Sequence, residues 1–228
     1  MFPNCKELPD ILAFSETWLT ENKCAPDKEG FKFEHADSKT QEAGGVGVYI
    51  SSELDYSIRN DLNLETKFVE DIWLDVTRRD KTKFVVGVIY RHPDHQFGTF
   101  CNNLCNTLDV LNKSKVNYLI VGDINIDVTK FNLVTNVTDY VNSLYSLGCN
   151  VCIDKPTRVT TTTSSCIDHL YSNLSPDRLD SHIIKSDVTD HYTTLTKIGD
   201  LSCEKENPEF FIAKVTCPIV NGNPSIQI

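Results

Sequence analysis

The sequence has no surplus of positive charge. Its 228 residues include 22 Lys and Arg against 32 Asp and Glu, which gives a formal net charge of −10. A protein whose binding rests on a large basic surface is therefore not expected. Phosphate substrates are not excluded, because acidic side chains can hold a divalent cation that then attracts the phosphate.

Long apolar runs and cysteines spaced for metal binding are also missing. No run approaches the roughly 20 residues of a membrane span, and the first ten residues, MFPNCKELPD, lack the apolar stretch of a secretory leader. We therefore expect the 9 cysteines to be reduced thiols of an intracellular protein. The pairs Cys149/Cys152 and Cys101/Cys105 have no second pair that would complete a zinc site, and Cys101 and Cys105 fit one face of a helix.

The chain shows no internal repeat and no linker before about residue 199. The segment AGGVGVY lacks the Lys-[ST] of a P-loop and the spacing of a dinucleotide fingerprint, so we interpret it as a turn and a strand. We predict one domain over residues 1–198 and a C-terminal extension over residues 199–228, which Phe210 and Phe211 would dock.

Short runs rich in β-branched and aromatic residues outnumber helical patterns. Predicted strands cover residues 10–19, 45–50, 71–77, 83–90, 117–123, 166–172 and 191–198. Apolar residues at three- and four-residue steps predict a helix over 97–113, and a second helix over 137–147 ends before Gly148. Two β-sheets packed face to face with a few helices outside fit this pattern better than one doubly wound sheet.

Polar residues follow these strands at the points where the apolar runs end. They are Glu16, Tyr90, Asp123, Asn125, Asp168, His169, Asp190 and His191. Functional groups tend to collect where strands end and loops begin, so we expect these side chains to face one cleft. Carboxylates suit Mg²⁺, an amide beside a carboxylate can orient a water, and a histidine can donate to a phosphoryl oxygen. Together they indicate metal-assisted phosphoester hydrolysis.

Each of these residues also has a simpler interpretation. An acidic residue at a strand end is more often a turn former or a helix cap than a ligand. His191 alone is equally typical of a half-buried histidine without a catalytic role. The prediction therefore depends on the joint occurrence of all the residue types.

Six ordered motifs carry a resemblance to a known family. They are SETWL (15–19), GGVGVYI (44–50), VIYRHP (88–93), VGDINID (121–127), KPTRVTTTTSSCIDHLYSN (155–173) and VTDHYTTL (188–195). In order and approximate spacing they resemble the endonuclease/exonuclease/phosphatase family, and within it the apurinic-type endonuclease domain of non-LTR (LINE-type) retrotransposons. The resemblance covers about residues 8 to 198. It implies a DNase I-like four-layer α/β sandwich, in which two mainly antiparallel sheets are flanked by helices.

The resemblance also implies roles for single residues. Glu16 and Asp190 fall on metal-site positions, and the implied cofactor is Mg²⁺, with Mn²⁺ as the alternative. Catalytic positions fall on Tyr90, Asp123, Asn125, Asp168 and His191. In this scheme Asp123 activates the water and Asp168 orients His191. Positions that face the substrate fall on Ser165, Arg91 and Arg158.

The chain departs from the family at its start. Family members begin with an inner strand that carries a metal-site asparagine, and only fifteen residues precede Glu16 here. We therefore expect a fold that lacks this first strand, with a gap in the sheet and one site element missing. Thr189 also replaces the usual serine of the S-D-H motif.

The resulting hypothesis is a Mg²⁺-dependent DNA-nicking phosphodiesterase. Nicked duplex DNA is the expected partner, with no membrane and no obligate protein partner inferred. Affinity for DNA would require that basic residues gather near the cleft; the candidates are Arg78, Arg79, Lys81, Lys83 and Arg91. Action on chromosomal DNA would place the protein in the nucleus, although no basic import cluster is evident. The alternatives are a hydrolase of small phosphoesters from the same superfamily and an inactive retrotransposon-derived fragment.

Overall fold

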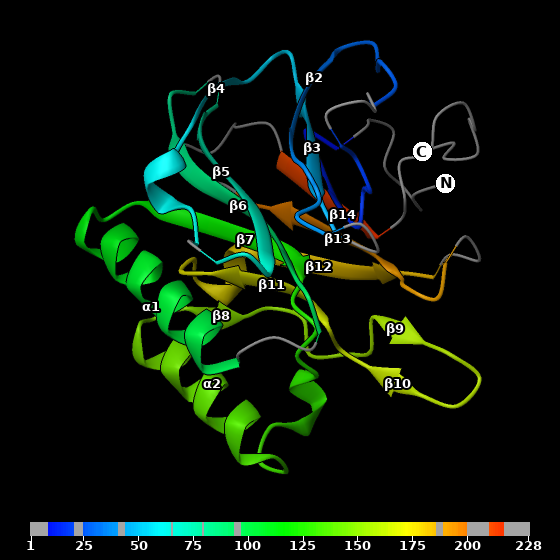
Figure 1. The fold of residues 1–228 in the computed structure, drawn as a ribbon. Coiled ribbons are helices and arrows are strands. Elements are labelled where there is room, and N and C mark those ends of the chain that lie inside the picture. The colour runs from blue at the N-terminus through cyan, green and yellow to red at the C-terminus, as the bar shows by residue number, and fades with distance from the viewer. Residues whose placement is uncertain are drawn as a thin grey trace.

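Two six-stranded β-sheets pack face to face in the computed structural model, which describes residues 9–20, 25–40, 44–64, 66–78, 80–93, 97–185, 189–199 and 210–216 (Figure 1). The first sheet has the order β12 (Leu179–Ile184), β13 (Thr193–Ile198), β14 (Phe210–Thr216), β1 (Ile11–Ser15), β3 (Val46–Ser51) and β2 (Phe31–Ala36). The second has the order β4 (Asp55–Ile58), β5 (Val69–Thr77), β6 (Lys83–Arg91), β7 (Asn117–Asp123), β11 (Asp168–Ser172) and β8 (Asn150–Val151). This arrangement confirms the predicted α/β sandwich.

Two helices, α1 (Phe97–Lys113) and α2 (Thr135–Ser146), lie against the second sheet (Figure 1). The predicted apolar face of α1 is buried, and Cys101 and Cys105 lie on this helix as expected. Helix α2 ends as predicted: Gly148 has a φ of +68°, and its N–H donates to the carbonyl of Tyr145 at 2.9 Å. Within the described residues the layers are therefore helix, sheet and sheet. None of these helices is long and apolar enough to cross a membrane.

The gap expected beside β1 is absent, because β14 fills it. This strand pairs in parallel with β1 and antiparallel with β13, so the described part of the first sheet is continuous there. Its first residue, Phe210, is 2% exposed and packs edge-on against Phe84 of the second sheet, with ring centroids 5.0 Å apart. Burying one such side chain contributes about 1.5–3 kcal/mol. Part of the predicted extension is thus an inner strand of the sandwich.

Three further strands have sequences without a clear signal. The strands β2 (FKFEHA), β4 (DYSI) and β12 (LDSHII) contain polar residues and are only partly buried, which explains why an apolar pattern does not mark them. A two-stranded ribbon of β9 (Arg158–Val159) and β10 (Ser164–Ser165) extends from the body (Figure 1). Three short 3₁₀ helices complete the described elements; they are η1 (Asn60–Leu62), η2 (Val128–Lys130) and η3 (Pro176–Arg178).

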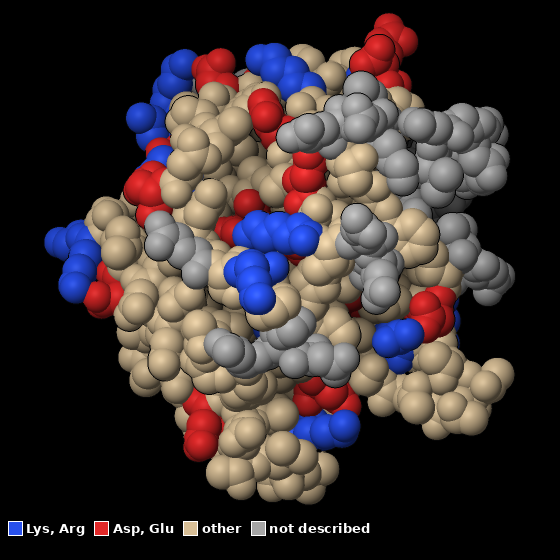
Figure 2. Space-filling view, in the orientation of Figure 1, with Lys and Arg blue, Asp and Glu red and all other residues tan. Residues whose placement is uncertain are grey.

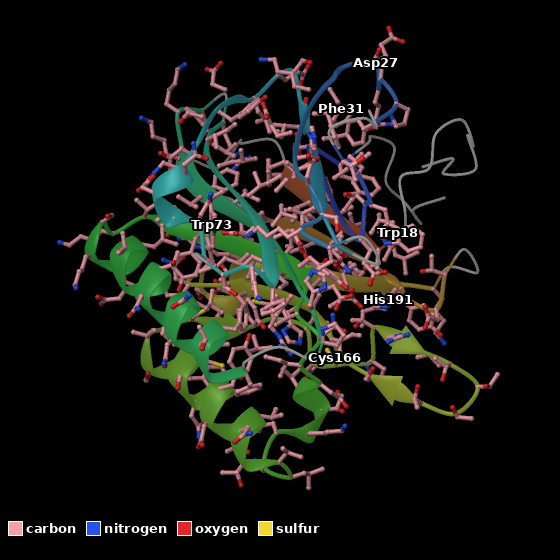
Figure 3. All side chains as sticks on the ribbon, viewed as in Figure 1. Trp18, Asp27, Phe31, Trp73, Cys166 and His191 are labelled. Carbon is pink, nitrogen blue, oxygen red and sulfur yellow. The ribbon has the colours of Figure 1, made fainter. Side chains whose placement is uncertain are left out.

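Trp73 of β5, which Figure 3 labels, is fully buried on the face of the second sheet opposite to the one that Phe84 presents to the first sheet. Its strand partner is Gly87, and a Cβ added there would lie 2.6 Å from the indole ring. The indole N–H donates to Oδ2 of Asp71 at 2.6 Å. The indole ring therefore fills the space that the missing side chain of Gly87 leaves on the neighbouring strand. Such close packing holds β5 and β6 rigidly, so that side chains at the ends of these strands have fixed positions.

Candidate active site

The strand register brings three of the predicted residues into one row. Asp123 at the end of β7 pairs with Tyr90 of β6 on one side and with Asp168 of β11 on the other. All three are at most 1% exposed. The apolar run YLIV is buried within β7, and the strand ends where its carboxylate reaches this row. Pairing of neighbouring strands thus places one hydroxyl and two carboxylates side by side.

Gly122 permits the close approach of β7 to β6. A Cβ at this position would lie 1.8 Å from the carbonyl oxygen of Ile89, so any other residue would force the strands apart. After Asp123 the chain turns through Asn125, which has a left-handed φ of +53°. The N–H of Asn125 donates to Oδ1 of Asp123 at 3.2 Å, and its side-chain amide donates to the carbonyl of Arg91 at 2.8 Å. Such strain in a fixed turn is typical of functional sites.

Glu16 reaches the same row from the first sheet. It follows β1, has a left-handed φ of +56°, and accepts a hydrogen bond from the Tyr90 hydroxyl at 2.9 Å. The next residues are held by the glycine turn, since the N–H of Thr17 donates to the carbonyl of Gly45 at 3.2 Å. Gly45 has a φ of +84°, and a Cβ there would lie 2.6 Å from the Thr17 hydroxyl. The GGVGVYI motif therefore positions Glu16 through its backbone.

His191 is held from behind by Asp168. The Nδ1 of the His191 ring lies 2.9 Å from Oδ2 of Asp168 and 4.0 Å from Oδ2 of Asp123. The other oxygen of Asp168, Oδ1, forms an ion pair with Nζ of Lys214 and accepts a hydrogen bond from the Thr216 hydroxyl at 3.0 Å. Asp168 is therefore fully engaged, and its position fixes the ring of His191.

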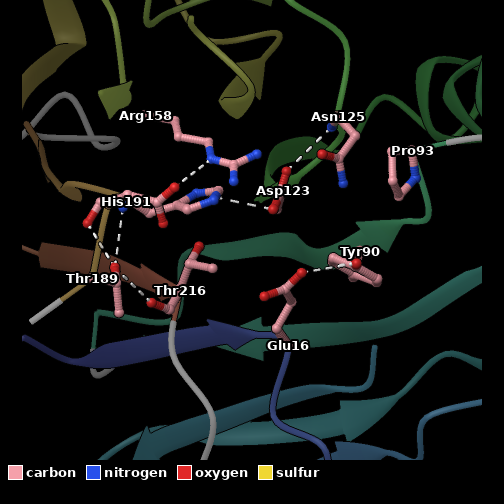
Figure 4. Close-up of a pocket in the computed structure, with 10 residues that line it drawn as sticks. Glu16, Tyr90, Pro93, Asp123, Asn125, Arg158, Thr189, His191 and Thr216 are labelled. Atoms are coloured by element: carbon pink, nitrogen blue, oxygen red, sulfur yellow. Dashed lines mark hydrogen bonds and ion pairs between the residues drawn. The ribbon is translucent and has the colours of Figure 1, made fainter. Parts of the chain in front are cut away.

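These groups surround one open cavity of about 210 Å³ (Figure 4). Its lining residues are Glu16, Tyr90, Pro93, Asp123, Asn125, Arg158, Thr189, Asp190, His191 and Thr216. Seven of the ten predicted site residues are among them, and an eighth, Asp168, lies directly behind His191. Figure 4 shows Glu16 and Tyr90 on one side of this cavity and Arg158 and His191 on the other.

The two paired aspartates differ in charge state although both are buried. Burial and the neighbouring charge of Asp168 together raise the pKa of Asp123 to about 7, against the opposing effect of the Lys214 and His191 charges. Burial also opposes ionisation of Asp168, but Lys214 and the hydrogen bond with His191 outweigh it and lower the pKa of Asp168. Asp168 is thus an anion, and Asp123 can accept a proton near neutral pH.

The pKa values of His191 and Tyr90, the two ring side chains with polar atoms in the cavity, are both raised. Burial opposes the charged form of His191, but the hydrogen bond and charge of Asp168 raise its pKa above the usual value. Burial, together with the charge of Glu16, raises the pKa of Tyr90, so its hydroxyl stays neutral. The cavity therefore offers the neutral hydroxyl of Tyr90 as a hydrogen-bond donor, and the raised pKa of His191 favours the form of its ring in which both nitrogens donate.

Three predicted residues lie elsewhere or are engaged otherwise. Arg91 is 3% exposed, and its Nε donates to the carbonyl of Ile124 at 2.8 Å, so it braces the turn after β7 and does not line the cavity. Ser165 lies in the ribbon strand β10 and does not line it either. Asp190 lies at the rim, where its carboxylate accepts a hydrogen bond from Nε of Arg158 at 2.8 Å.

The proposed basic patch does not form beside the cavity. Arg78 is 5% exposed and its guanidinium lies over the ring of Phe210, while Lys81 and Lys83 do not line the cavity. Arg79 lies outside the described residues. On the face that Figure 2 shows, basic and acidic side chains of the described residues are scattered among neutral ones, and neither sign covers a large area.

Two residues of the site were missed in the sequence. Lys214 and Thr216 come from β14, about 200 positions after Glu16. The only available signal was the β-branched and aromatic run FFIAKVT, which is typical of a strand. Its separation from the other motifs by a polar segment left it unassigned.

The residues around the cavity fit a hard divalent cation. Three carboxylates line it, those of Glu16, Asp123 and Asp190, whereas Arg158 and His191 are the cationic side chains among its described lining residues. Carboxylate, amide and hydroxyl oxygens are ligands that Mg²⁺ accepts. The geometry also groups Asp123, Asp168 and His191 as a possible metal cluster, but the ammonium of Lys214 already binds Asp168 within it. Glu16, on the open side, is the better candidate ligand.

Solved structures with the same fold include several nucleases. No protein-family model and no curated protein matches the sequence. The endonuclease domain of TRAS1, a telomere-specific non-LTR retrotransposon, is 14% identical with a TM-score of 0.65, covering 85% of this chain and 100% of that domain.

Two other similar structures are a 3′-5′ exonuclease and a catalytic domain. The exonuclease NExo from Neisseria meningitidis is 14% identical, with a TM-score of 0.61 and coverage of 85% of this chain and 91% of that chain. The Xenopus laevis APE2 catalytic domain is 14% identical, with a TM-score of 0.58 and coverage of 85% and 86%. The chain therefore has the DNase I-like fold of the endonuclease/exonuclease/phosphatase proteins.

Proposed function

We propose that this chain hydrolyses phosphodiester bonds in DNA, as a metal-dependent nicking endonuclease of the non-LTR retrotransposon type. The observation that carries the proposal is the convergence of Glu16, Tyr90, Asp123 and His191 on one cavity, with Asp168 behind the histidine. The similar fold of a retrotransposon endonuclease domain and of an exonuclease supports nucleic acid as the substrate class. If the target is chromosomal, the protein acts in the nucleus.

The side chains divide the reaction between them. Asp123, with its pKa near 7, takes a proton from the attacking water, which the side-chain amide of Asn125, anchored on the Arg91 carbonyl, helps to orient. As the water oxygen bonds to phosphorus, the bond to the leaving sugar oxygen breaks, and that oxygen takes a proton from solvent. His191, protonated and held by Asp168, donates a hydrogen bond to a phosphoryl oxygen as negative charge grows there. The neutral hydroxyl of Tyr90 contacts a second phosphate oxygen.

A cation is needed because the cavity is acidic. A phosphodiester entering it would meet three carboxylates. Glu16 would hold Mg²⁺ or Mn²⁺, which when bound neutralises charge on the phosphate. Binding has a readout that is independent of turnover, because an ion that binds only the folded chain raises its melting temperature. We expect Mg²⁺ to raise the melting temperature of the wild type and to have little effect on Glu16→Gln.

Nicking of a supercoiled plasmid tests the proposal. With Mg²⁺, the Asp123→Ala and His191→Ala variants should turn over at least about 10²-fold more slowly than wild type. Matched controls are Asp109→Ala, an exposed carboxylate of α1, and His182→Ala, an exposed histidine of β12, which should leave the rate unchanged. Equal rates in wild type and both cavity variants would refute the assignment of these residues.

One alternative substrate class has an observation in its favour. The net charge of −10 and the mixed surface in Figure 2 give little long-range attraction for DNA, and they suit a small soluble phosphoester better. Turnover of such an ester without plasmid nicking would replace the DNA proposal. The inactive-fragment alternative rested on a missing inner strand, and β14 occupies that place. Metal-dependent turnover of neither substrate would favour the inactive fragment.

A further inference from the structure

Four buried side chains lie on one face of the strand β14, and they differ in character along its length. Side chains at every second residue of a strand share one face, and on this strand Phe210, Ile212, Lys214 and Thr216 are all buried. Phe210 packs against Phe84 of the second sheet, whereas Lys214 and Thr216 reach Asp168 of the second sheet. One face of a single strand therefore changes from apolar to polar toward the cavity.

Lys214 is an unusual residue for this position. It is 1% exposed, in an inner strand with pairing partners on both sides. A charged side chain is almost never buried so completely unless it is paired, because removing it from water costs several kcal/mol. Its ammonium contacts Oδ1 of Asp168 and the hydroxyl of Thr216. Packing alone would favour Met or Leu here, so the charge needs another explanation.

The carboxylate of Asp168 links β14 to the His191 ring. Oδ1 receives the Lys214 ammonium and the Thr216 hydroxyl, and both oxygens face the His191 ring, with Oδ2 at 2.9 Å and Oδ1 at 3.1 Å from its Nδ1. The Thr216 hydroxyl is itself fixed by the Ser15 hydroxyl at 3.0 Å, one residue before Glu16. A chain of contacts thus runs from the start of the Glu16 segment through β14 to the ring of His191.

We propose that Lys214 and Thr216 are positioning residues: they hold Asp168 so that its carboxylate orients the His191 ring toward the substrate. The proposal deepens the proposed function and rests on it. In this arrangement β14 completes the site, because without the ammonium the buried carboxylate of Asp168 would lose its cationic partner and its fixed orientation. The same ammonium places a positive charge beside the Asp123, Asp168 and His191 cluster, so no metal ion is required there.

The test compares Lys214→Met with wild type in three measurements. Lys214→Met keeps the length of the side chain and removes its charge. We expect kcat for plasmid nicking to fall about tenfold or more with little change in KM, because the ring of His191 would no longer be held in place. The strongly deshielded NMR resonance of the His191 Nδ1 proton, assigned by its absence in His191→Asn, should weaken or disappear. Lys214→Arg should retain part of both signals.

Lys113→Met is the matched control, since Lys113 is an exposed lysine of α1 outside the cavity. It should leave kcat and the resonance unchanged. Thermal melting separates loss of the site from loss of the fold. If Lys214→Met does not fold, Thr216→Val decides, because it removes one hydroxyl at nearly constant volume and should lower kcat several-fold with a weakened resonance.

An unchanged kcat and an unchanged resonance in a folded Lys214→Met, or in Thr216→Val where that variant decides, would overturn the proposal. Failure of the proposed function would give a different result, because the wild type would then cleave no DNA at all. In that case the NMR resonance of His191 alone tests whether Lys214 positions the ring. Its loss in Lys214→Met still establishes the positioning of His191, and its persistence refutes it.

Discussion

Two acid–base pairs flank His191, one in the interior and one at the mouth of the cavity. The inner pair, Lys214 with Asp168, has side chains 1% and 0% exposed, and the outer pair, Arg158 with Asp190, has both side chains 42% exposed. Both join segments that are distant in sequence. The surrounding medium differs, because water screens the outer charges and is excluded from the inner ones.

This difference assigns different roles to chemically similar pairs. The inner aspartate also holds the His191 ring and the Thr216 hydroxyl, so several groups depend on its charge and orientation. The outer pair has solvent as a competing partner, so few other groups depend on its geometry. An interior ion pair can therefore fix the ring of His191 in place, whereas the rim pair is weak enough to exchange partners.

The largest expected effect is on the inner pair. Asp168→Asn keeps the shape of the side chain but leaves the Lys214 ammonium buried without a counter-charge. We expect the free energy of unfolding to fall by about 3–5 kcal/mol, measured by urea denaturation at pH 7. A smaller loss from the double variant Asp168→Asn, Lys214→Met would show that the two charges are coupled. A loss below about 1 kcal/mol for the single variant would contradict the view that this pair is structurally important.

Helices and strands could be predicted from the sequence where neighbouring residues alone produce a clear apolar pattern. Helix α1 was predicted at its observed bounds, because its apolar steps complete several turns without interruption. Strand β7 was also predicted at its bounds, since an uninterrupted apolar run ends at a glycine and a carboxylate. Edge strands such as β4 were missed, because an exposed edge needs no apolar alternation.

Candidate site residues were predicted where they lie in motifs, and they were missed where only topology brings them in. The GDIN segment carries its own turn, so Asp123 and Asn125 could be named together. Lys214 could not, because nothing in FFIAKVT tells which two strands it will lie between. Arg91 shows the opposite error: its place beside Tyr90 favoured a substrate contact, yet its guanidinium binds the Ile124 carbonyl in the interior.

The second prediction concerns Asp123, which lies in the interior like Asp168 but has a raised pKa. Because the folded state holds the proton more tightly than the unfolded state, its contribution to stability is present below about pH 4 and is lost as pH rises to about 7. The stability of wild type relative to Asp123→Asn should therefore fall by roughly 2–4 kcal/mol over this window. Asp168 has a lowered pKa, so it titrates below the window in both proteins. Urea denaturation at several pH values measures the difference, and a constant difference would mean that Asp123 is ionised throughout.

The smallest expected effect is on the outer pair and sharpens the comparison most. Arg158→Ala removes the partner of Asp190, yet solvent replaces it, so the free energy of unfolding should change by less than about 1 kcal/mol. If Arg158 contacts phosphate, the same variant should raise KM for DNA and flatten its dependence on salt. Asp190→Asn is the matched control, because it also breaks the pair but leaves the cation in place. A large loss of stability in Arg158→Ala, or equal effects of both variants on KM, would make the outer pair structural like the inner one.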